Sequence, residues 1–376
     1  VNFLILAKKV RLKPTFEQEN LLWKSVGTAR WVYNWALFKQ EESYKHGGTF
    51  ISDVDLRKEL TRLKKQQDFS WLNDVSNNVA KQAVKDACDA YKKFFKGLAD
   101  QPRFKNKKKS KPSFYNDNVK LKVKKDSVLI EKVGWIQISE QVPIGVKYKN
   151  PRISFDGKYW YLSVGIEQEN PKQELTNETL GIDVGVKELA VCSNGMVFKN
   201  INKTRTVKKA EKHLRRLQRR VSRKYEMNKE GNRFVKTSNI IKHEKKIRLV
   251  QRKLTNIRNN HIHQVTCAIV KTKPGAVVVE TLNVKGLMKN KHLAKAIGQQ
   301  KLYDFKVKLQ YKCEKYGITF VEVDKWYPSS KMCSSCGSIK KDLKLSDRVY
   351  TCTCGLEMDR DINAAINLAN YGKLVV

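Results

Sequence analysis

The sequence has few acidic residues for its length and no long apolar run. Its 376 residues include 37 Asp and Glu against 76 Lys and Arg, a formal net charge of +39. No apolar stretch approaches the roughly 18 residues of a transmembrane helix, so we expect no membrane span. The apolar residues 1–7 precede Lys8 and Lys9 and lack a cleavage region, so we expect no secretion signal. These absences favour a cytoplasmic protein.

The positive charge implies a partner of opposite sign. Positive charges in such excess repel one another within the folded chain, which is unfavourable unless a polyanion neutralises them. Nucleic acid is the natural polyanion, and its affinity for such a chain falls steeply with salt. Nothing in the composition indicates a small-molecule substrate. The 7 Trp, 14 Tyr and 14 Phe need a buried core, which argues against a disordered chain, and the length leaves room for two or three domains.

The eight cysteines form two groups. Four are scattered singly, which is the usual distribution of small buried side chains: Cys88, Cys192, Cys267 and Cys313. The other four crowd into 22 positions: Cys333, Cys336, Cys352 and Cys354. Without a secretion signal, a metal site is expected rather than disulfides, and four thiolates in two close pairs suit one structural Zn²⁺. The second pair is shortened to Cys-x-Cys, so its ligand geometry is the less certain of the two.

Hydrophobic periodicity predicts an α+β organisation. Residues 15–97 carry apolar side chains at spacings of three and four, typical of helices, and one such helix runs from Asn78 to Gly97. Residues 1–12 and 113–168 contain short runs of β-formers separated by turns, which predicts a sheet or small β-barrel. Residues 169–178 are polar and read as a linker. We therefore expect a helical block inserted into a β-domain.

The segment from Arg30 to Trp35 is both aromatic and basic. Its simplest interpretation is the core-facing side of an amphipathic helix. Base stacking is possible for one face only.

Two basic segments are candidate contacts to nucleic acid. The loop from Pro102 to Pro112 is expected to contact phosphates, and its candidate residues are Arg103, Lys105, Lys107 and Lys108. Residues 203–260 hold 21 Lys and Arg against 4 acidic residues and predict a helical hairpin turning near residues 228–232. Its two apolar stripes consist of Leu214, Leu217, Val221, Ile240, Ile241, Ile247, Val250, Leu254 and Ile257. Packing does not require a face of one sign, so this hairpin favours a nucleic-acid groove over a solvated face. Its candidate residues are Arg215, Arg216, Arg219 and Arg220.

Three acidic residues interrupt or end apolar segments. Asp183 lies within the apolar strand 180–186, where a carboxylate has to be paired or bound to a metal. Glu280 follows the apolar β-formers 276–279 and is either the first exposed residue or part of a site. Asp361 lies near the start of a short helix, where N-capping is the alternative. Each signal alone is ambiguous.

Together the three acids predict a nuclease. Asp on a strand, Glu on a later strand and Asp on a late helix is the order that a RuvC-type RNase H fold needs. Oxygen ligands from different elements can hold two Mg²⁺ about 4 Å apart, one polarising the attacking water and the other stabilising the leaving 3′-oxygen. A zinc ribbon directly before Asp361 is expected to act as a rigid clip for that residue.

Several motifs resemble the transposon-encoded TnpB (OrfB) proteins, the ancestral relatives of type V CRISPR effector nucleases. The resemblance covers nearly the whole chain. Its specific motifs are Gly181–Lys187, Val277–Leu282, Tyr327–Gly337 and Asp359–Ala365. The segments Arg30–Trp35 and Pro102–Lys105 match moderately well. The Cys352-x-Cys354 pair departs from the pattern and puts the local zinc geometry in doubt.

The resemblance implies three parts and an RNA-guided DNA endonuclease. Residues 1–12 and 113–178 would form a wedge-like β-barrel, 13–112 a helical recognition lobe, and 179–376 a RuvC nuclease with a zinc-binding target-nucleic-acid-binding insert at about 327–356. Such a protein binds a guide RNA from the transposon end, opens duplex DNA beside a short adjacent motif and cuts both strands with one site. It would work in the prokaryotic cytoplasm, associated with the nucleoid.

The same resemblance assigns site residues. It implies that the catalytic Mg²⁺ ligands are Asp183, Glu280 and Asp361, and Asp359 is the alternative for the third position. Guide pairing would read the target sequence, while the protein reads a short duplex motif and backbone shape. Gln82 is one candidate for reading that motif.

Three other functions stay open. A DNA transposase with an RNase H fold would need strand transfer and an end-binding domain, which is not evident. A non-cleaving RNA-guided repressor predicts a broken acid set, whereas all three acids are present. A compact CRISPR-associated effector differs from the transposon protein only in its genomic neighbours.

Overall fold

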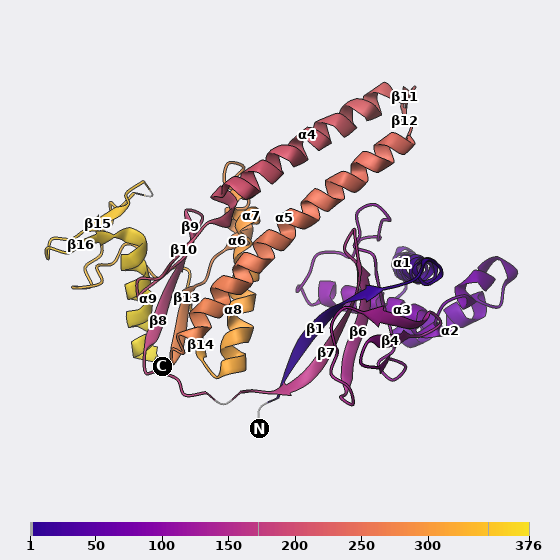
Figure 1. The fold of residues 1–376 in the computed structure, drawn as a ribbon, viewed down its shortest axis with the longest axis horizontal. Helices are drawn as coiled ribbons and strands as arrows, with labels where there is room; N and C mark the ends of the chain where they lie inside the picture. Colours follow the sequence, from indigo (N-terminus) through magenta and orange to yellow (C-terminus); the bar gives the residue numbers. More distant parts are fainter. Residues whose placement is uncertain (1–2, 172, 345, 376) are drawn as a thin grey trace. The chain divides into compact units, whose positions relative to one another are not determined.

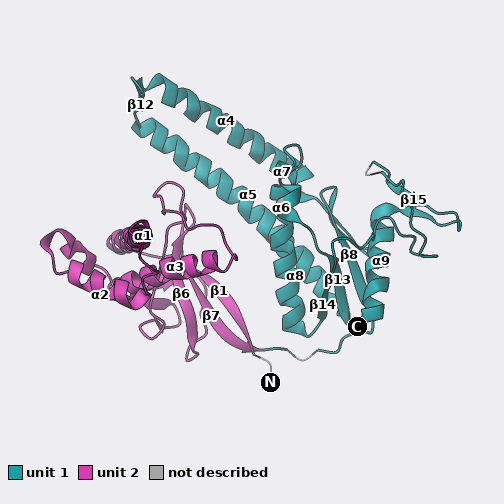
Figure 2. Cartoon of the chain, turned by 180° about the vertical axis from the view of Figure 1, so that it is seen from behind, with its two compact units in different colours: residues 1, 170–376 teal, residues 2–169 magenta. Residues whose placement is uncertain are grey.

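The computed structural model describes residues 3–171, 173–344 and 346–375. The chain divides into two compact units, Asn2–Glu169 and Asn170–Val376 (Figure 2). The boundary lies at the start of the polar segment that was predicted to be a linker. Thr176 in this segment donates its backbone N–H to the Lys273 carbonyl at 2.8 Å, so part of the segment is bound to the second unit. No helix within the described residues is long and apolar enough to cross a membrane.

The first unit is built on an antiparallel sheet of seven strands in the order β2-β6-β7-β1-β5-β4-β3. The strands are β1 (Phe3–Lys13), β2 (Ser113–Tyr115), β3 (Lys122–Val123), β4 (Ser127–Ile130), β5 (Gly134–Ile138), β6 (Tyr148–Phe155) and β7 (Trp160–Glu169). β1 pairs along its length with β7, from Phe3 opposite Glu169 to Leu12 opposite Trp160. The prediction that the first residues complete this sheet is therefore confirmed. The sheet is a half-barrel, and its description as a wedge-like barrel stays a prediction.

Helices interrupt the sheet between β1 and β2 (Figure 1). They are α1 (Phe16–Lys45), α2 (Asp53–Leu63), the 3-10 helix η1 (Gln67–Asn73) and α3 (Asn77–Phe95). Thr15 starts α1 with a capping box, because its hydroxyl accepts from the Gln18 N–H while the Gln18 side chain accepts from the Thr15 N–H. Leu22 and Val26 of α1 pack into the core of the sheet, whereas Leu37 joins a second core with α2 and α3.

The second unit contains a mixed sheet of five strands in the order β10-β9-β8-β13-β14. The strands are β8 (Thr179–Val184), β9 (Glu188–Cys192), β10 (Val197–Lys199), β13 (Ala276–Glu280) and β14 (Thr319–Val323). β13 is parallel to β8 and β14, and β9 is antiparallel to β8. The apolar run of β13 is explained by burial on both faces, since Val277 and Val279 face one core and Val278 faces another.

Helices cover both faces of this sheet. α5 (Ser238–Lys271) and α8 (Leu302–Tyr316) contribute to the core around Val277, while α9 (Arg360–Val375) packs over β8 and β13 (Figure 1). Shorter elements complete the unit: η2 (Ile201–Lys203), α6 (Val284–Leu287), α7 (Ala294–Gln300), β15 (Val349–Thr351) and β16 (Glu357–Asp359). Three of the single cysteines are buried as predicted, but the expectation is wrong for Cys267, which is exposed on α5.

The predicted basic hairpin consists of α4 (Arg205–Met227) and α5, which lie side by side (Figure 1). The turn falls within the predicted segment, where β11 (Lys229–Glu230) and β12 (Arg233–Phe234) pair across Gly231 at φ 56°. Leu217, Val221 and Leu254 are buried between the two helices. Ile241, predicted to belong to the apolar stripe, is instead about half exposed. α5 continues beyond residue 260 to Lys271, because Ile262 and Ile269 join the core under the sheet.

Candidate catalytic site, zinc cluster and nucleic-acid interface

The structure brings the three predicted acids to one edge of the mixed sheet. Asp183 and Glu280 each lie one residue beyond Ile182 and Val279, which are paired across the parallel strands β8 and β13. Because side chains alternate along a strand and both Ile182 and Val279 face the core under α5 and α8, the two acids project toward the opposite face. That face is covered by α9, whose first turn carries Asp361.

Two glycines allow α9 to lie this close to the sheet. A Cβ on Gly181 would lie 2.0 Å from the Ala365 carbonyl oxygen and 2.4 Å from the Ala369 nitrogen. A Cβ on Gly372 would lie 2.4 Å from the Val278 side chain. Any larger residue at either position would push the helix away from the strands. Gly185 is different, because a Cβ there would make only an ordinary contact, at 3.5 Å from the Glu188 carbonyl oxygen.

The start of α9 distinguishes the two rival aspartates. The Asp359 carboxylate accepts from the backbone N–H of Asp361 at 2.8 Å and of Ile362 at 3.3 Å. This is the bonding of an N-cap residue, so Asp359 rather than Asp361 caps the helix. The Asp361 carboxylate contacts Arg360 at 3.3 Å and is largely buried.

The acids influence one another electrostatically. Burial, followed by the charges of Asp361 and Glu280, raises the pKa of Asp183 to about 7, and Arg360 opposes the shift only in part. Burial also raises the pKa of Glu280. The cluster therefore carries more negative than positive charge. Carboxylates supplied by two strands and a helix are the hard oxygen ligands that Mg²⁺ prefers.

The four predicted zinc ligands converge in space. The sulfurs of Cys333, Cys336, Cys352 and Cys354 all lie within 4.8 Å of one another. Cys333 Sγ lies 3.6 Å from Cys354 Sγ, and Cys336 Sγ lies 3.5 Å from Cys352 Sγ. Zn–S bonds of about 2.3 Å in a tetrahedron place sulfurs roughly 3.8 Å apart, so these thiols fit one Zn²⁺.

Each cysteine pair is followed by a glycine whose N–H bonds back to the first cysteine of the pair. The Gly337 N–H donates to the Cys333 carbonyl at 2.9 Å, and the Gly355 N–H donates to the Cys352 carbonyl at 3.0 Å. Both glycines have positive φ, 76° and 90°, which side-chain-bearing residues rarely adopt. A hydrogen bond from the Cys354 backbone is the first cause that lowers the pKa of Cys352, to about 5. Despite a backbone hydrogen bond with Leu356, the side-chain hydrogen bond with Cys352 raises the pKa of Cys354 to about 11, so within this pair the thiolate is favoured at Cys352.

Two asparagines connect the cysteine cluster to α9. The Asn363 amide donates to the Met332 carbonyl at 2.7 Å, and its oxygen accepts from the Ser334 N–H at 3.0 Å. Asn367, one turn later, donates to the carbonyls of Ser329 and Met332. Both asparagines are fully buried, and their bonds surround Cys333 on either side in sequence. Sequence reasoning missed them, although two Asn four residues apart on an otherwise apolar helix face was the available signal.

The basic candidates differ in exposure. Arg215, Arg216, Arg219 and Arg220 are all exposed along α4. In the loop after α3, Arg103, Lys107 and Lys108 are exposed. Lys105 instead lies with its ammonium 3.7 Å from the centroid of the Tyr33 ring, and burial lowers its pKa. Its backbone is held by the Asn34 side chain through two hydrogen bonds of 3.0 and 2.7 Å, so Lys105 also anchors the loop.

Gln82 is held within the first unit as well. Its amide donates to the Asp86 carboxylate at 2.8 Å, and Arg152 donates two bonds of 2.9 Å to the same group. Although burial opposes the shift, these hydrogen bonds keep the pKa of Asp86 below its usual value.

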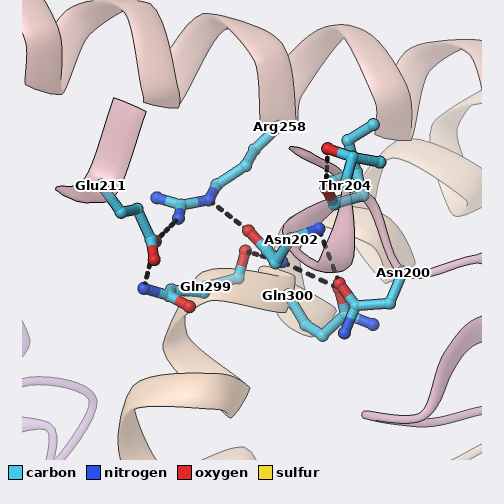
Figure 3. A network of polar contacts seen from close by, with 8 residues as sticks. Asn200, Asn202, Thr204, Glu211, Arg258, Gln299 and Gln300 are labelled. Carbon is cyan, nitrogen blue, oxygen red and sulfur yellow. Dashed lines mark hydrogen bonds and ion pairs between the residues drawn. The ribbon is translucent and has the colours of Figure 1, made fainter. Parts of the chain in front are cut away.

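A partly buried polar network joins the base of the hairpin to η2 and the end of α7 (Figure 3). Arg258 of α5 donates to Glu211 of α4 at 2.8 Å and to Asn202 at 2.7 Å. Asn202 in turn donates to the Gln300 side chain at 3.2 Å, and Gln300 donates to the Gly185 carbonyl at 3.1 Å. Sequence reasoning missed these residues, because nothing local marks polar partners that lie about a hundred positions apart.

Comparisons with known proteins match nearly the whole chain. A family model described as "Probable transposase" matches residues 161–291, "Helix-turn-helix domain" matches 4–49, and "Cas12f1-like, TNB domain" matches 303–368. Residues 4–49 form one strand and one long helix in the structure. A "Putative RNA-guided DNA endonuclease" of Streptomyces pristinaespiralis is 31% identical over 97% of this chain and 89% of its own length.

A second relative and one solved structure extend the likeness. The "Putative RNA-guided DNA endonuclease InsQ" of Escherichia coli (strain K12) is 29% identical over 98% of this chain and 93% of its own length. A Cas12f1–sgRNA–target DNA complex contains a chain with a similar fold, at a TM-score of 0.61 and 15% identity, covering 98% of this chain and 99% of that one.

Proposed function

Because the chain belongs to the transposon-encoded TnpB (OrfB) family of RNA-guided DNA endonucleases, we propose that it binds a guide RNA from the transposon end and cleaves duplex DNA beside a short adjacent motif. The observation that carries the proposal is the meeting of Asp183, Glu280 and Asp361 at one sheet edge, in a chain related over nearly its full length to proteins of that name. The net charge of +39 supports binding of both nucleic acids.

In this proposal Asp183, Glu280 and Asp361 hold two Mg²⁺. The metal ions supply polarisation of the attacking water and charge stabilisation at the leaving 3′-oxygen. The protein's own contribution is position: the parallel pairing of β8 and β13 fixes two carboxylates, and the close packing of α9 at Gly181 fixes the third. Asp359 would serve this site indirectly by capping α9.

The four cysteines would hold one structural Zn²⁺ within a target-nucleic-acid-binding insert at about 327–356. Their chemistry supports this, because a Zn²⁺ ion bound by four thiolates has no open coordination position for a substrate. The hydrogen bonds of Asn363 and Asn367 would transmit the rigidity of the zinc ribbon to the first turns of α9. These hydrogen bonds support the expectation that the zinc ribbon holds Asp361 in position.

The remaining parts follow the family arrangement. We assign residues 179–376 to a RuvC nuclease, 1–12 with 113–178 to a wedge-like barrel, and 13–112 to a helical recognition lobe. The exposed arginines of α4 and the exposed cations Arg103, Lys107 and Lys108 would contact phosphates, while guide pairing reads the sequence. Lys105 would contribute through the position of its loop, and Gln82 would reach the adjacent motif from its network with Asp86.

The direct experiment uses the protein purified with its own RNA. Sequencing the co-purified RNA should return transcripts from the transposon end. The complex, supplied with Mg²⁺ and a plasmid library that matches the guide, should cut both strands beside a shared short motif. The repressor alternative predicts bound RNA without cleavage. The transposase alternative predicts joined ends without a need for RNA, and genomic neighbours alone would separate a CRISPR-associated effector.

A further inference from the structure

A pocket in the first unit, lined by tryptophans and cations, has no part in the functions assigned above. It lies between α1 and η1, and its lining includes Lys24, Gly27, Arg30, Trp31 and Trp71. We propose that this pocket binds one unstacked nucleobase of the guide RNA or the target DNA, together with its phosphate. The inference rests on the proposed function, because that function supplies the ligand.

The aromatic wall of the pocket is held in place and partly exposed. Trp71 packs edge-to-face on Trp31, with ring centroids 5.4 Å apart and planes at 82°. Trp31 also packs against Phe69, with ring centroids 5.7 Å apart, so a second aromatic ring holds it in place. Trp71 remains 38% exposed, so part of its ring is accessible to a ligand. An indole held like this is a stacking surface that accepts any base.

A glycine in the middle of α1 keeps the pocket open. Gly27 lies in the interior of a 30-residue helix, where glycine is less favourable than alanine. Apart from its two chain neighbours and the adjacent backbone of α1, no described atom lies within 4 Å of the position that a Cβ would occupy there. Neither internal packing nor a positive φ therefore requires glycine at this position. A ligand that enters the pocket would explain it, because a side chain at residue 27 would fill the same space.

The charges of the pocket favour a nucleotide over a peptide. Within the described part of the chain, Arg30 makes no hydrogen bond or ion pair and is available to a phosphate. Lys24 pairs with Asp74 at 3.3 Å, and both side chains are more than half exposed, so this pair is weak and a phosphate can replace the carboxylate. An apolar side chain would not need the cations, and an acidic one would not need the indoles.

The first variant fills the pocket without removing any contact that the protein makes. Gly27→Leu places an apolar side chain in the open space and improves helix propensity, so its thermal unfolding temperature should be no lower than that of the wild type. Asn20→Leu is the matched control, because it adds the same side chain at an exposed position of α1 outside the pocket. Trp71→Ala removes the stacking surface, and Trp71→Phe retains an aromatic ring.

Two affinities are measured for each variant: that of the protein for its co-purified guide RNA, and that of the complex for matching target DNA. Gly27→Leu and Trp71→Ala should each weaken one affinity by about five- to 150-fold, while Asn20→Leu and Trp71→Phe stay near wild type. A loss at the RNA step identifies a guide base, and a loss at the DNA step alone identifies a target base.

If all four variants keep both affinities within about twofold of an active wild type, the pocket assignment is overturned while the proposed function stands. A wild type that carries no RNA and cuts no DNA overturns both. As a second measurement, ultraviolet cross-linking of the wild-type complex should attach a nucleotide to the peptide that contains Trp71. Attachment of nucleotides elsewhere only would also overturn the assignment.

Discussion

The four thiols of the second unit lie within 4.8 Å of one another, and in the described residues no other set of His, Cys, Asp or Glu converges as closely. Asp183, Glu280 and Asp361 share an edge of the sheet, where burial and then the charges of the other two raise the pKa of Asp183, yet they stay farther apart than the thiols. The thiols come from two local turns, each closed by a glycine N–H, whereas the carboxylates come from two strands and a helix. The first site is shaped by local sequence, and the second depends on the packing of the whole unit.

The largest effect should come from removing one carboxylate. Asp183→Asn or Glu280→Gln keeps the size of the side chain and removes the charge that would bind metal. We expect guided cleavage to fall by about a thousandfold or more, with guide and target binding within about twofold of wild type, because phosphate contacts lie elsewhere. Plasmid cleavage and DNA-binding assays check this. Cleavage at wild-type rates by either variant would show that the metal is held by other residues.

Breaking the thiol cluster should have the next largest effect. Cys333→Ser should lower bound zinc from about one per chain, as measured by elemental analysis, and reduce cleavage by about ten- to a hundredfold through α9. Cys267→Ser is the matched control, because Cys267 is a single exposed thiol outside the cluster. Active wild-type protein that contains no zinc would contradict the ribbon assignment.

Asn363→Ala sharpens the comparison by cutting the connection between the two sites. The change leaves the Ser334 N–H without its partner and removes one of the two hydrogen bonds to the Met332 carbonyl, which Asn367 retains; the lost partner costs about 1–3 kcal/mol in folding free energy. Cleavage should fall about tenfold while the zinc content stays at the wild-type level. Asn370→Ala, at a half-buried position of the same helix, should behave as wild type. Equal activity of the two variants would mean that the ribbon does not position Asp361.

Charge removal on α4 should change binding gradually. Replacing Arg215, Arg216, Arg219 and Arg220 with Gln keeps helix propensity broadly similar. Each phosphate contact that is lost should make the slope of log K against log salt shallower by about 0.9 on duplex or 0.7 on single strands. Guided cleavage should fall as well. A variant with wild-type affinity, salt slope and cleavage would show that this face of the hairpin is only solvated.

The smallest effect concerns stability without metal. Asp183 titrates near pH 7 in the folded chain and near its ordinary value, 3.8, when unfolded. Below about pH 4 it is neutral in both states. Between about pH 4 and 7 only the unfolded chain ionises, so the folding stability falls as the pH rises, and the full loss is reached above about pH 7. In EDTA, Asp183→Asn should therefore raise the unfolding temperature by about 2–8 °C at pH 8, and the difference should vanish near pH 4. Calorimetry that finds Asp183→Asn no more stable at pH 8 would contradict this cost.

The same contrast explains what the sequence could predict. The helices of 15–97, the first strand and the basic hairpin follow from apolar periodicity, and the thiols follow from their spacing. The three acids required their order along the chain to be considered together. The close contact at Gly181 and the network of Arg258 and Gln300 could not be predicted from the sequence. Both depend on packing, which brings together a helix and a strand, or polar partners, that are far apart in the chain. Cys267 is exposed although isolated cysteines are usually buried, and Ile241 is exposed although periodicity places it on an apolar stripe, because neither residue type nor periodicity shows what covers a side chain.

The most direct test of the carboxylate site compares two aspartates that are two residues apart. Asp361→Asn and Asp359→Asn are each purified with the guide RNA, and cleavage of the matching plasmid is measured with Mg²⁺. Asn is a good N-cap, so Asp359→Asn should keep α9 in place and retain cleavage within about threefold of wild type. Asp361→Asn should lose cleavage by about a thousandfold while it still binds target DNA. The reverse result, with Asp359→Asn inactive and Asp361→Asn active, would contradict the account.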